Sequence, residues 1–267
     1  MPNISRMFSK IRNAFKRHEI DLRHLARIAD SHQHGMDSLR KRAADANADP
    51  LGSHGRFLIE ALRDLAAAAY HLDHDPVGWR RQLDEAGRLG FALVQRSAYG
   101  FSVEPSRLSP LVYTTLLDLL AAGNLATAEQ LARRMLLEDD SEKYAKFDLA
   151  FAYSLKHLVL KDANACRVWL TEFVDACAES DTGAFAGYPK VIEAILMKDA
   201  GRCEKGLHEI LRGHRTLIAK GGELWGTDQI FMCTWALGLT NLALRRGLHI
   251  ELPDDEFLPR DLLLQVG

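Results

Sequence analysis

The sequence predicts an all-α protein in which antiparallel helix pairs stack as an irregular solenoid. Apolar residues recur at helical spacing along most of the chain, and strand signals are almost absent. The turn Leu/Met-Lys-Asp-Ala-x-x-Cys occurs twice, which places Cys166 and Cys203 37 residues apart. A period of this length with one helix pair per unit is typical of helical repeats. With 267 residues, 47% of them hydrophobic, the chain is long enough to bury a sizeable core.

The N-terminal part, residues 1–99, reads as a series of helices. Residues 1–18 predict a basic amphipathic helix because apolar residues recur at helical spacing among five Lys and Arg. Such a helix fits three roles: docking on the body of the protein, an organelle presequence, or a membrane-surface helix. Residues 20–46 continue the helical pattern, with an interruption expected around His32 to Gly35, and residues 47–52 form a turn.

Two further helices complete this part. One is expected from Ser53 to Tyr70. The next starts at Asp75-Pro76, an N-cap residue followed by proline at the first helical position, and carries apolar residues from Trp79 to Val94. The break at 99–105 is the best linker candidate, but it is short. We therefore expect a single domain over 1–267: N-terminal helices (1–99), helical-pair repeats (106–246) and a C-terminal tail (247–267).

The repeat region predicts three helix pairs of a tetratricopeptide-like kind. Their expected bounds are 109–122 with 126–137, 144–160 with 165–177, and 189–197 with 202–218. The tail begins where an apolar helix ends at Gly247, a residue suited to a left-handed C-cap. Leu248 to Leu252 reads as a short extended C-terminal segment, and Pro259 opens a final apolar stretch.

Few residues suggest catalysis or metal binding. His71 and His74 lie three apart beside two aspartates, a spacing that can bring metal ligands together, but His and Asp are also common at helix ends. His32 and His34 point apart on a helix. The chain has no Gly-x-Ser-x-Gly, no Ser/His/Asp grouping and no cysteine beside a histidine. We therefore expect a protein that is not an enzyme and uses no metal or cofactor.

The charge and cysteine content of the chain restrict the classes of binding partner and the cellular compartment that we expect. The 34 basic and 36 acidic residues nearly cancel, so no global charge favours nucleic acid. No apolar run reaches the roughly 18 residues that a membrane span needs. The four cysteines form no Cys-x-x-Cys pair and read as buried free thiols, which fits a reducing compartment.

Two features are candidates for binding a protein partner. Four acids, Glu138, Asp139, Asp140 and Glu142, gather in a loop between helix pairs. This loop is either plain solvated sequence or an acidic surface that complements a basic partner. Trp225 lies among glycines and either fills the core or is exposed as a binding anchor.

The C-terminal region resembles a known family. Trp235-Ala236, Arg246-Gly247-Leu248, Asp254-Asp255 and Pro259-x-x-Leu262 occur in the order found in the bacterial immunity protein 49 family. The resemblance is clearest over 190–265 and implies an all-helical cytoplasmic protein that binds a cognate toxin and neutralises it by occlusion. The family offers no catalytic residues to transfer, and the matching residues read physically as a helix stop and a tail clamp.

Three hypotheses follow. The first is an immunity protein whose toxin contacts include the 138–142 loop and Trp225. The second is a tetratricopeptide-like scaffold or regulator that binds a peptide or protein in a concave groove. The third, a metal-dependent enzyme, depends on His71 and His74 alone.

Overall fold

The computed structural model describes residues 21–45, 47–98, 105–135, 145–178, 182–252 and 255–265. All regular secondary structure in these ranges is helical, which confirms the predicted all-α class. The predicted helix over residues 1–18 and the acidic loop at 138–142 lie outside the described residues.

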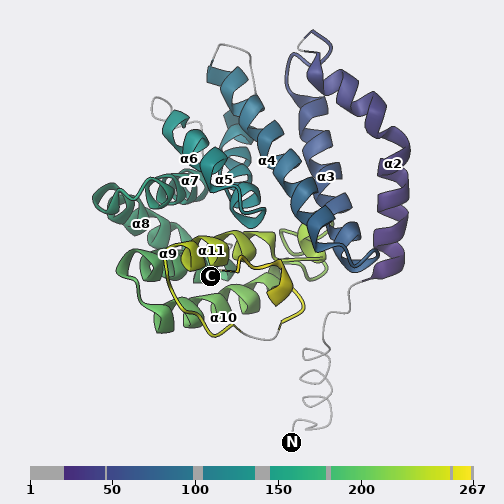
Figure 1. Ribbon diagram of the computed structural model, residues 1–267. Helices are drawn as coiled ribbons and strands as arrows, with labels where there is room; N and C mark the ends of the chain where they lie inside the picture. Colours follow the sequence, from purple (N-terminus) through teal and green to yellow (C-terminus); the bar gives the residue numbers. More distant parts are fainter. Residues whose placement is uncertain are drawn as a thin grey trace, which may run out of the picture.

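Three N-terminal helices stand side by side (Figure 1): α2 (Leu22–Ala44), α3 (Ser53–His71) and α4 (Pro76–Ala98). The interruption expected at 32–35 is wrong, because α2 is continuous through Gly35. Leu25, Ala29 and Met36 are buried along one face of α2, and this packing offsets the roughly 1 kcal/mol that a glycine costs in a helix. Asp75 caps α4 as predicted and accepts a hydrogen bond from the Gly78 amide at 2.8 Å.

Adjacent antiparallel pairs follow, as the repeat pattern predicts. They are α5 (Pro105–Ala121) with α6 (Leu125–Arg134), α7 (Lys146–Val159) with α8 (Ala163–Cys177), and α9 (Gly187–Met197) with α10 (Ala200–Leu217). A short 3-10 helix, η2 (Gly183–Phe185), precedes α9. Across the linker candidate, α4 and α5 pack directly against each other.

The repeated turn has one geometry in all three pairs. It combines a residue with positive φ, a side chain that caps the next helix, and a fully buried small residue four positions after the cap. The positive-φ residues are Gly123 (85°), Lys161 (62°) and Lys198 (55°). The capping residues are Asn124, Asp162 and Asp199, and the buried ones are Ala128, Cys166 and Cys203.

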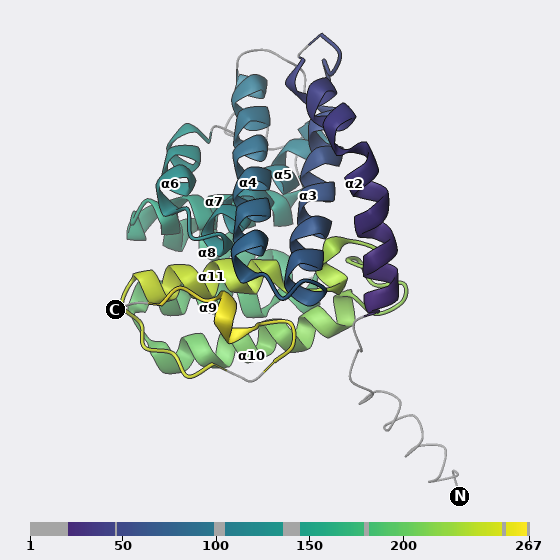
Figure 2. The same cartoon turned by 45° about the vertical axis from the view of Figure 1, so that its right-hand side comes forward.

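The last helix, α11 (Thr234–Arg245), departs from a simple stack. It packs mainly against α5 rather than against its sequence neighbour α10. A Cβ atom at Gly238 would lie 2.6 Å from the Leu117 carbonyl oxygen, so the two backbones approach closely only because residue 238 is glycine. In Figures 1 and 2, α9, α10 and α11 lie across the base beneath the upright helices.

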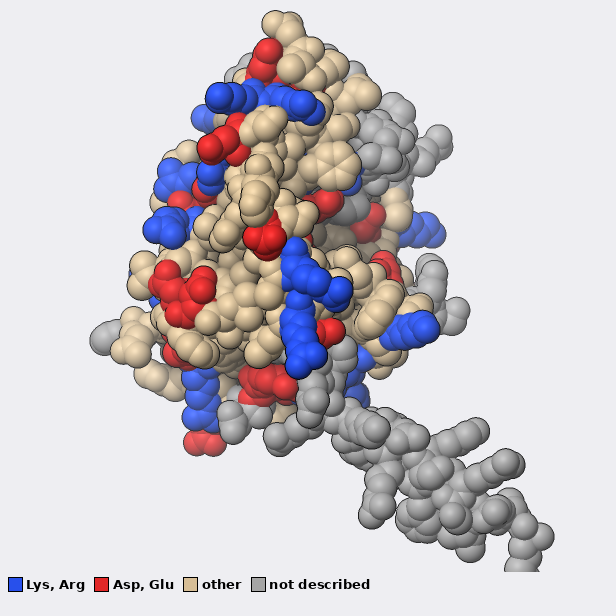
Figure 3. Space-filling view, turned by 90° about the vertical axis from the view of Figure 1, so that its right-hand side faces the viewer, with Lys and Arg blue, Asp and Glu red and all other residues tan. Residues whose placement is uncertain are grey.

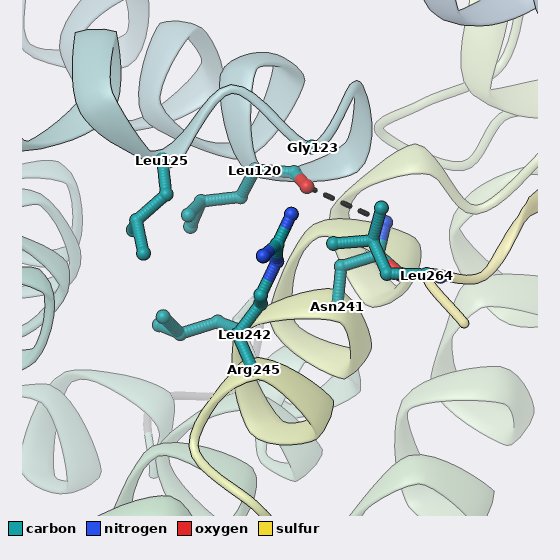
Figure 4. A pocket seen from close by; sticks show the side chains of 7 residues that line it. All are labelled: Leu120, Gly123, Leu125, Asn241, Leu242, Arg245 and Leu264. Carbon is teal, nitrogen blue, oxygen red and sulfur yellow. Dashed lines mark hydrogen bonds between the residues drawn. The ribbon is translucent and has the colours of Figure 1, made fainter. Parts of the chain in front are cut away.

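The C-terminal tail is clamped to this core (Figure 4). Gly247 ends the chain's last α-helix with a φ of 81°, and residues 248–252 have no regular secondary structure. Asn241 accepts a hydrogen bond from the Leu264 amide at 2.9 Å and donates one to the Ala121 carbonyl at 2.9 Å. The tail and the end of α5 are therefore held by one buried amide. A 3-10 helix, η4 (Arg260–Leu262), lies within the tail.

The cysteines are buried free thiols, as predicted. Burial raises the pKa of all four to about 12, so they carry no thiolate at neutral pH. Within the described ranges, every helix is too short or too polar to cross a membrane.

Candidate interaction surface

Trp225 lies on the surface rather than in the core. Its side chain is 50% exposed, while the preceding Leu224 is 8% exposed and takes the buried place. Of the two alternatives for this tryptophan, the structure supports the exposed one. The four acids expected to accompany it, Glu138, Asp139, Asp140 and Glu142, lie outside the described residues.

The loop that carries Trp225 connects α10 to α11 and has a defined conformation. Gly221 and Gly226 have φ values of 84° and 83°, which only glycine adopts without strain. The Leu224 amide donates to the Leu217 carbonyl at 2.9 Å, and the Trp225 amide donates to the Gly222 carbonyl at 3.1 Å. Backbone hydrogen bonds on both sides therefore fix the position from which the indole projects.

This loop meets α3 through the 3-10 helix η3 (Asp228–Ile230). On α3, Phe57, Glu60 and Asp64 share one helical face because they are spaced i, i+3, i+7. Phe57 is 61% exposed. We call the combined surface the acidic face and define it by six residues: Phe57, Glu60, Asp64, Glu223, Trp225 and Asp228.

Figure 3 looks at the side of the molecule on which α2 lies. Acidic side chains lie in and beside a hollow in this side. An open cleft of about 370 Å³ on α2 adds His24, Arg27 and His32 to the same side. The cleft is lined by residues of α2, and His32 connects it to Asp64 of the acidic face.

A buried ion pair lies beneath the acidic face. Arg63 of α3 donates from Nε at 2.9 Å and from Nη2 at 2.7 Å to one oxygen of Asp118 on α5. Burial raises the pKa of Asp118 to about 6 against the opposing effect of Arg63. Burial also disfavours the charge on Arg63, but Asp118 and Asp228 outweigh it and raise the pKa of that guanidinium.

Asp64 connects the acidic face to α2. His32 and Asp64 form a hydrogen bond of 3.0 Å between Nε2 and Oδ2. Burial and the nearby Asp228 raise the pKa of Asp64 to about 6, although the His32 contact works in the other direction. Burial also raises the pKa of Asp228. Asp228 also raises the pKa of Asp118, while Arg63 and Gln229 oppose the effect of burial on the pKa of Asp228 itself.

Tyr113 of α5 extends the same network. Its ring stacks on Phe151 with 4.7 Å between centroids, and its hydroxyl hydrogen-bonds to Asp148. Burial, Asp148 and Glu223 together raise the pKa of Tyr113 well above its ordinary value, so the phenol stays neutral and donates its proton.

The interacting groups carry an excess of negative charge. Six carboxyl groups act on one another, on Tyr113 or on Arg63: Glu60, Asp64, Asp118, Asp148, Glu223 and Asp228. Arg63 pairs with Asp118, and a nitrogen of Arg56 lies 3.7 Å from an oxygen of Glu60. Exposed aromatic rings in the same segments as Glu60 and Glu223 suit a protein partner with a basic surface. Phe57, Glu60 and Asp64 were not predicted as binding residues, although their i, i+3, i+7 spacing places them on one helical face.

The histidine pair considered for metal binding has structural roles. His71 donates from Nε2 to the Phe231 carbonyl at 3.0 Å, and burial lowers its pKa. His74 has a φ of 52° in the turn before Asp75. Across the described ranges, no group of three or more His, Cys, Asp or Glu side chains is placed to hold a metal ion.

The C-terminal elements of the family resemblance also have structural roles. Trp235 packs edge-on to Tyr113 with ring centroids 5.5 Å apart, and Leu262 is fully buried. Asp255 accepts a hydrogen bond from Arg215 at 2.6 Å. These residues hold the tail and the core together, as their pattern predicts. In comparisons with protein-family models, curated proteins and solved structures, the chain matches none of them.

Proposed function

We propose that this protein is an immunity protein, which binds a cognate bacterial toxin in the cytoplasm and neutralises it by occlusion. The observation that carries the proposal is the exposed Trp225 of the acidic face, which projects from a fixed loop between Glu223 and Asp228. The ordered C-terminal residues that resemble the immunity protein 49 family support the same reading.

The acidic face has the properties of a surface that complements a basic partner. Interface hot spots are enriched in tryptophan surrounded by residues that exclude water, and Trp225 and Phe57 supply two aromatic anchors. Carboxylates around them increase the association rate of a basic partner and disfavour acidic ones. A toxin with a basic substrate cleft has the chemistry that this face requires. The acids at 138–142 remain predicted contributors to the same partner.

The test is protection from the toxin encoded by the neighbouring gene. Cells that express this toxin are expected to grow when they also express the full chain and to stop growing when they do not. Purified protein is expected to capture the toxin in a pull-down. Failure of both assays, with the toxin shown to be active, would overturn the proposal.

Paired variants then locate the contact. Phe57→Ala/Trp225→Ala removes both aromatic anchors and is expected to weaken toxin binding by at least about 100-fold, since each hot-spot truncation costs about 2 kcal/mol. Val168→Ala/Val174→Ala is the matched control because both valines are exposed, at 65% and 51%, on α8. In Figures 1 and 2, α8 lies on the side of the molecule away from α2. Equal loss in both variants would contradict this location.

The second candidate is a tetratricopeptide-like scaffold that binds a peptide or protein partner. It is favoured by the stacked helix pairs and uses the same acidic face. Binding of basic peptides without any protection from the toxin would support this candidate instead.

A further inference from the structure

A second candidate site lies where the repeated turns converge. It is a cleft of about 420 Å³ between the start of α6, the α7–α8 turn, the α9–α10 turn and the end of α11. Its lining combines four cations, one carboxylate and three apolar side chains: Lys161, Lys198, Arg245, Arg246, Glu129, Leu125, Val159 and Leu242. In Figures 1 and 2, α6 and α8 lie on the side opposite α2, so this cleft is separate from the acidic face.

The charges in the cleft are not balanced by the protein. Glu129 is the only carboxylate in the described lining, against four cations. Arg246 donates to the carbonyls of Leu158 and Val159 at the end of α7, which holds its guanidinium at the wall. Arg245 extends from α11 towards the turn at Gly123 and lies between Leu125 and Leu264 in Figure 4.

The two lysines occupy backbone positions that favour glycine. Lys161 and Lys198 have φ values of 62° and 55°, whereas the equivalent place in the first turn is taken by Gly123. A lysine in the left-handed region raises the free energy of the folded state by about 1 kcal/mol or more. Residues with such backbone strain are frequent at functional sites. A cation also suits the C-terminus of a helix, but that effect does not explain why both lysines line the same cleft with Arg245 and Arg246.

From this arrangement we propose that the cleft binds an organic di- or triphosphate. Lysine and arginine are the side chains that bind phosphate oxygens, through point charges and paired N–H donors respectively. The cleft volume lies in the range of small-molecule sites. Leu125, Val159 and Leu242 give an apolar wall for the organic part of the ligand. This ligand adds to the proposed function and does not depend on it.

The test is calorimetric titration of the full-length protein with ATP, inorganic triphosphate and a glutamate-rich peptide at about 50 mM salt. ATP is expected to bind more tightly than inorganic triphosphate, because only ATP can use the apolar wall, and higher salt is expected to weaken both. No binding of ATP at millimolar concentration would overturn the proposal. Tighter binding of the peptide, or equal affinity for ATP and triphosphate, would overturn the ligand class.

A glycine variant separates binding from folding. Lys161→Gly/Lys198→Gly is expected to weaken ATP binding at least about tenfold, since each lost cation removes a phosphate contact. Its melting temperature should stay close to that of the wild type, because glycine relieves the left-handed strain while adding unfolded-state entropy. Lys205→Gln/Lys220→Gln removes two exposed lysines that do not line the cleft. Equal affinity in the glycine variant and the wild type would overturn the site.

Discussion

At the scale of single residues, the protein places carboxyl groups where their charge is not fully compensated. Asp118 keeps one oxygen without a hydrogen-bond partner although it is paired with Arg63. Among the described residues, Asp64 has His32 as its one hydrogen-bond partner and lies near Asp228. Such groups reduce the stability of the isolated protein at neutral pH, and a cationic partner can recover part of this free energy on binding.

Asp64 makes stability depend on pH in a particular direction. Its pKa is raised from 3.8 to about 6 in the folded protein, so the folded state holds this proton more strongly than the unfolded state does. This contribution favours folding as the pH falls from 7 to 5 and amounts to about 1 kcal/mol over that interval. In urea unfolding at pH 7 and pH 5, Asp64→Asn is therefore expected to gain less free energy of unfolding than the wild type.

His32 supplies the control for this prediction. His32→Gln keeps Asp64 and removes the contact that opposes the raised pKa of Asp64, so the gain between pH 7 and pH 5 should persist. An identical pH response in the wild type and in Asp64→Asn would show that Asp64 does not carry the effect.

At the scale of elements, the repeated turn is the best example of what the sequence could predict. The pattern Lys-Asp-Ala-x-x-Cys predicted a turn between two helices and a buried cysteine, and both occur at both copies. The capping roles of Asp162 and Asp199 were not predicted, although aspartate before a helix is the available signal. Neighbouring residues determine these features, because helix ends and caps depend on local backbone geometry and local side-chain hydrogen bonds. The continuity of α2 was mispredicted because its apolar face is stabilised by α3, which no local pattern reveals.

The capping role can be measured at the second turn. Asp162 accepts a hydrogen bond from the Ala165 amide at 3.1 Å, and Asn124 has the equivalent role in the first turn. Asp162→Ala is expected to lower the free energy of unfolding by about 1 kcal/mol, while Asp162→Asn should keep most of it. Both variants lose the same charge, so chemical denaturation isolates the hydrogen bond. Equal destabilisation by the two substitutions would contradict this role.

At the scale of the whole molecule, the predicted stack of helix pairs is correct, but the sequence did not predict that α11 packs back against α5. α11 returns to pack on α5 in the middle of the chain, and Gly238 and Asn241 make this approach possible. Long-range pairing of this kind depends on shape rather than on local pattern. The acidic face has the same origin, because α3 and the loop before α11 meet only in the folded protein.

The two candidate sites, the acidic face and the basic cleft between the turns, therefore have different origins in the fold. The basic cleft arises from repetition, since neighbouring turns bring Lys161 and Lys198 to the same place. The acidic face arises from the meeting of segments more than 150 residues apart, Phe57 to Asp64 and Glu223 to Asp228. Sequence patterns could have revealed the basic cleft. For the acidic face, they could have revealed only the part on α3, where Phe57, Glu60 and Asp64 share one helical face.

The most direct measurement of the central claim is the association rate of the purified protein with its cognate toxin at low and high salt. We expect Glu60→Gln/Glu223→Gln to slow association at least about tenfold at 50 mM salt. The difference should largely disappear near 0.5 M salt, because screening removes the electrostatic steering. The control Glu172→Gln/Asp175→Asn, which neutralises two exposed acids on α8, should associate like the wild type. Unchanged association of Glu60→Gln/Glu223→Gln at low salt would contradict the assignment of the acidic face as the toxin-binding surface.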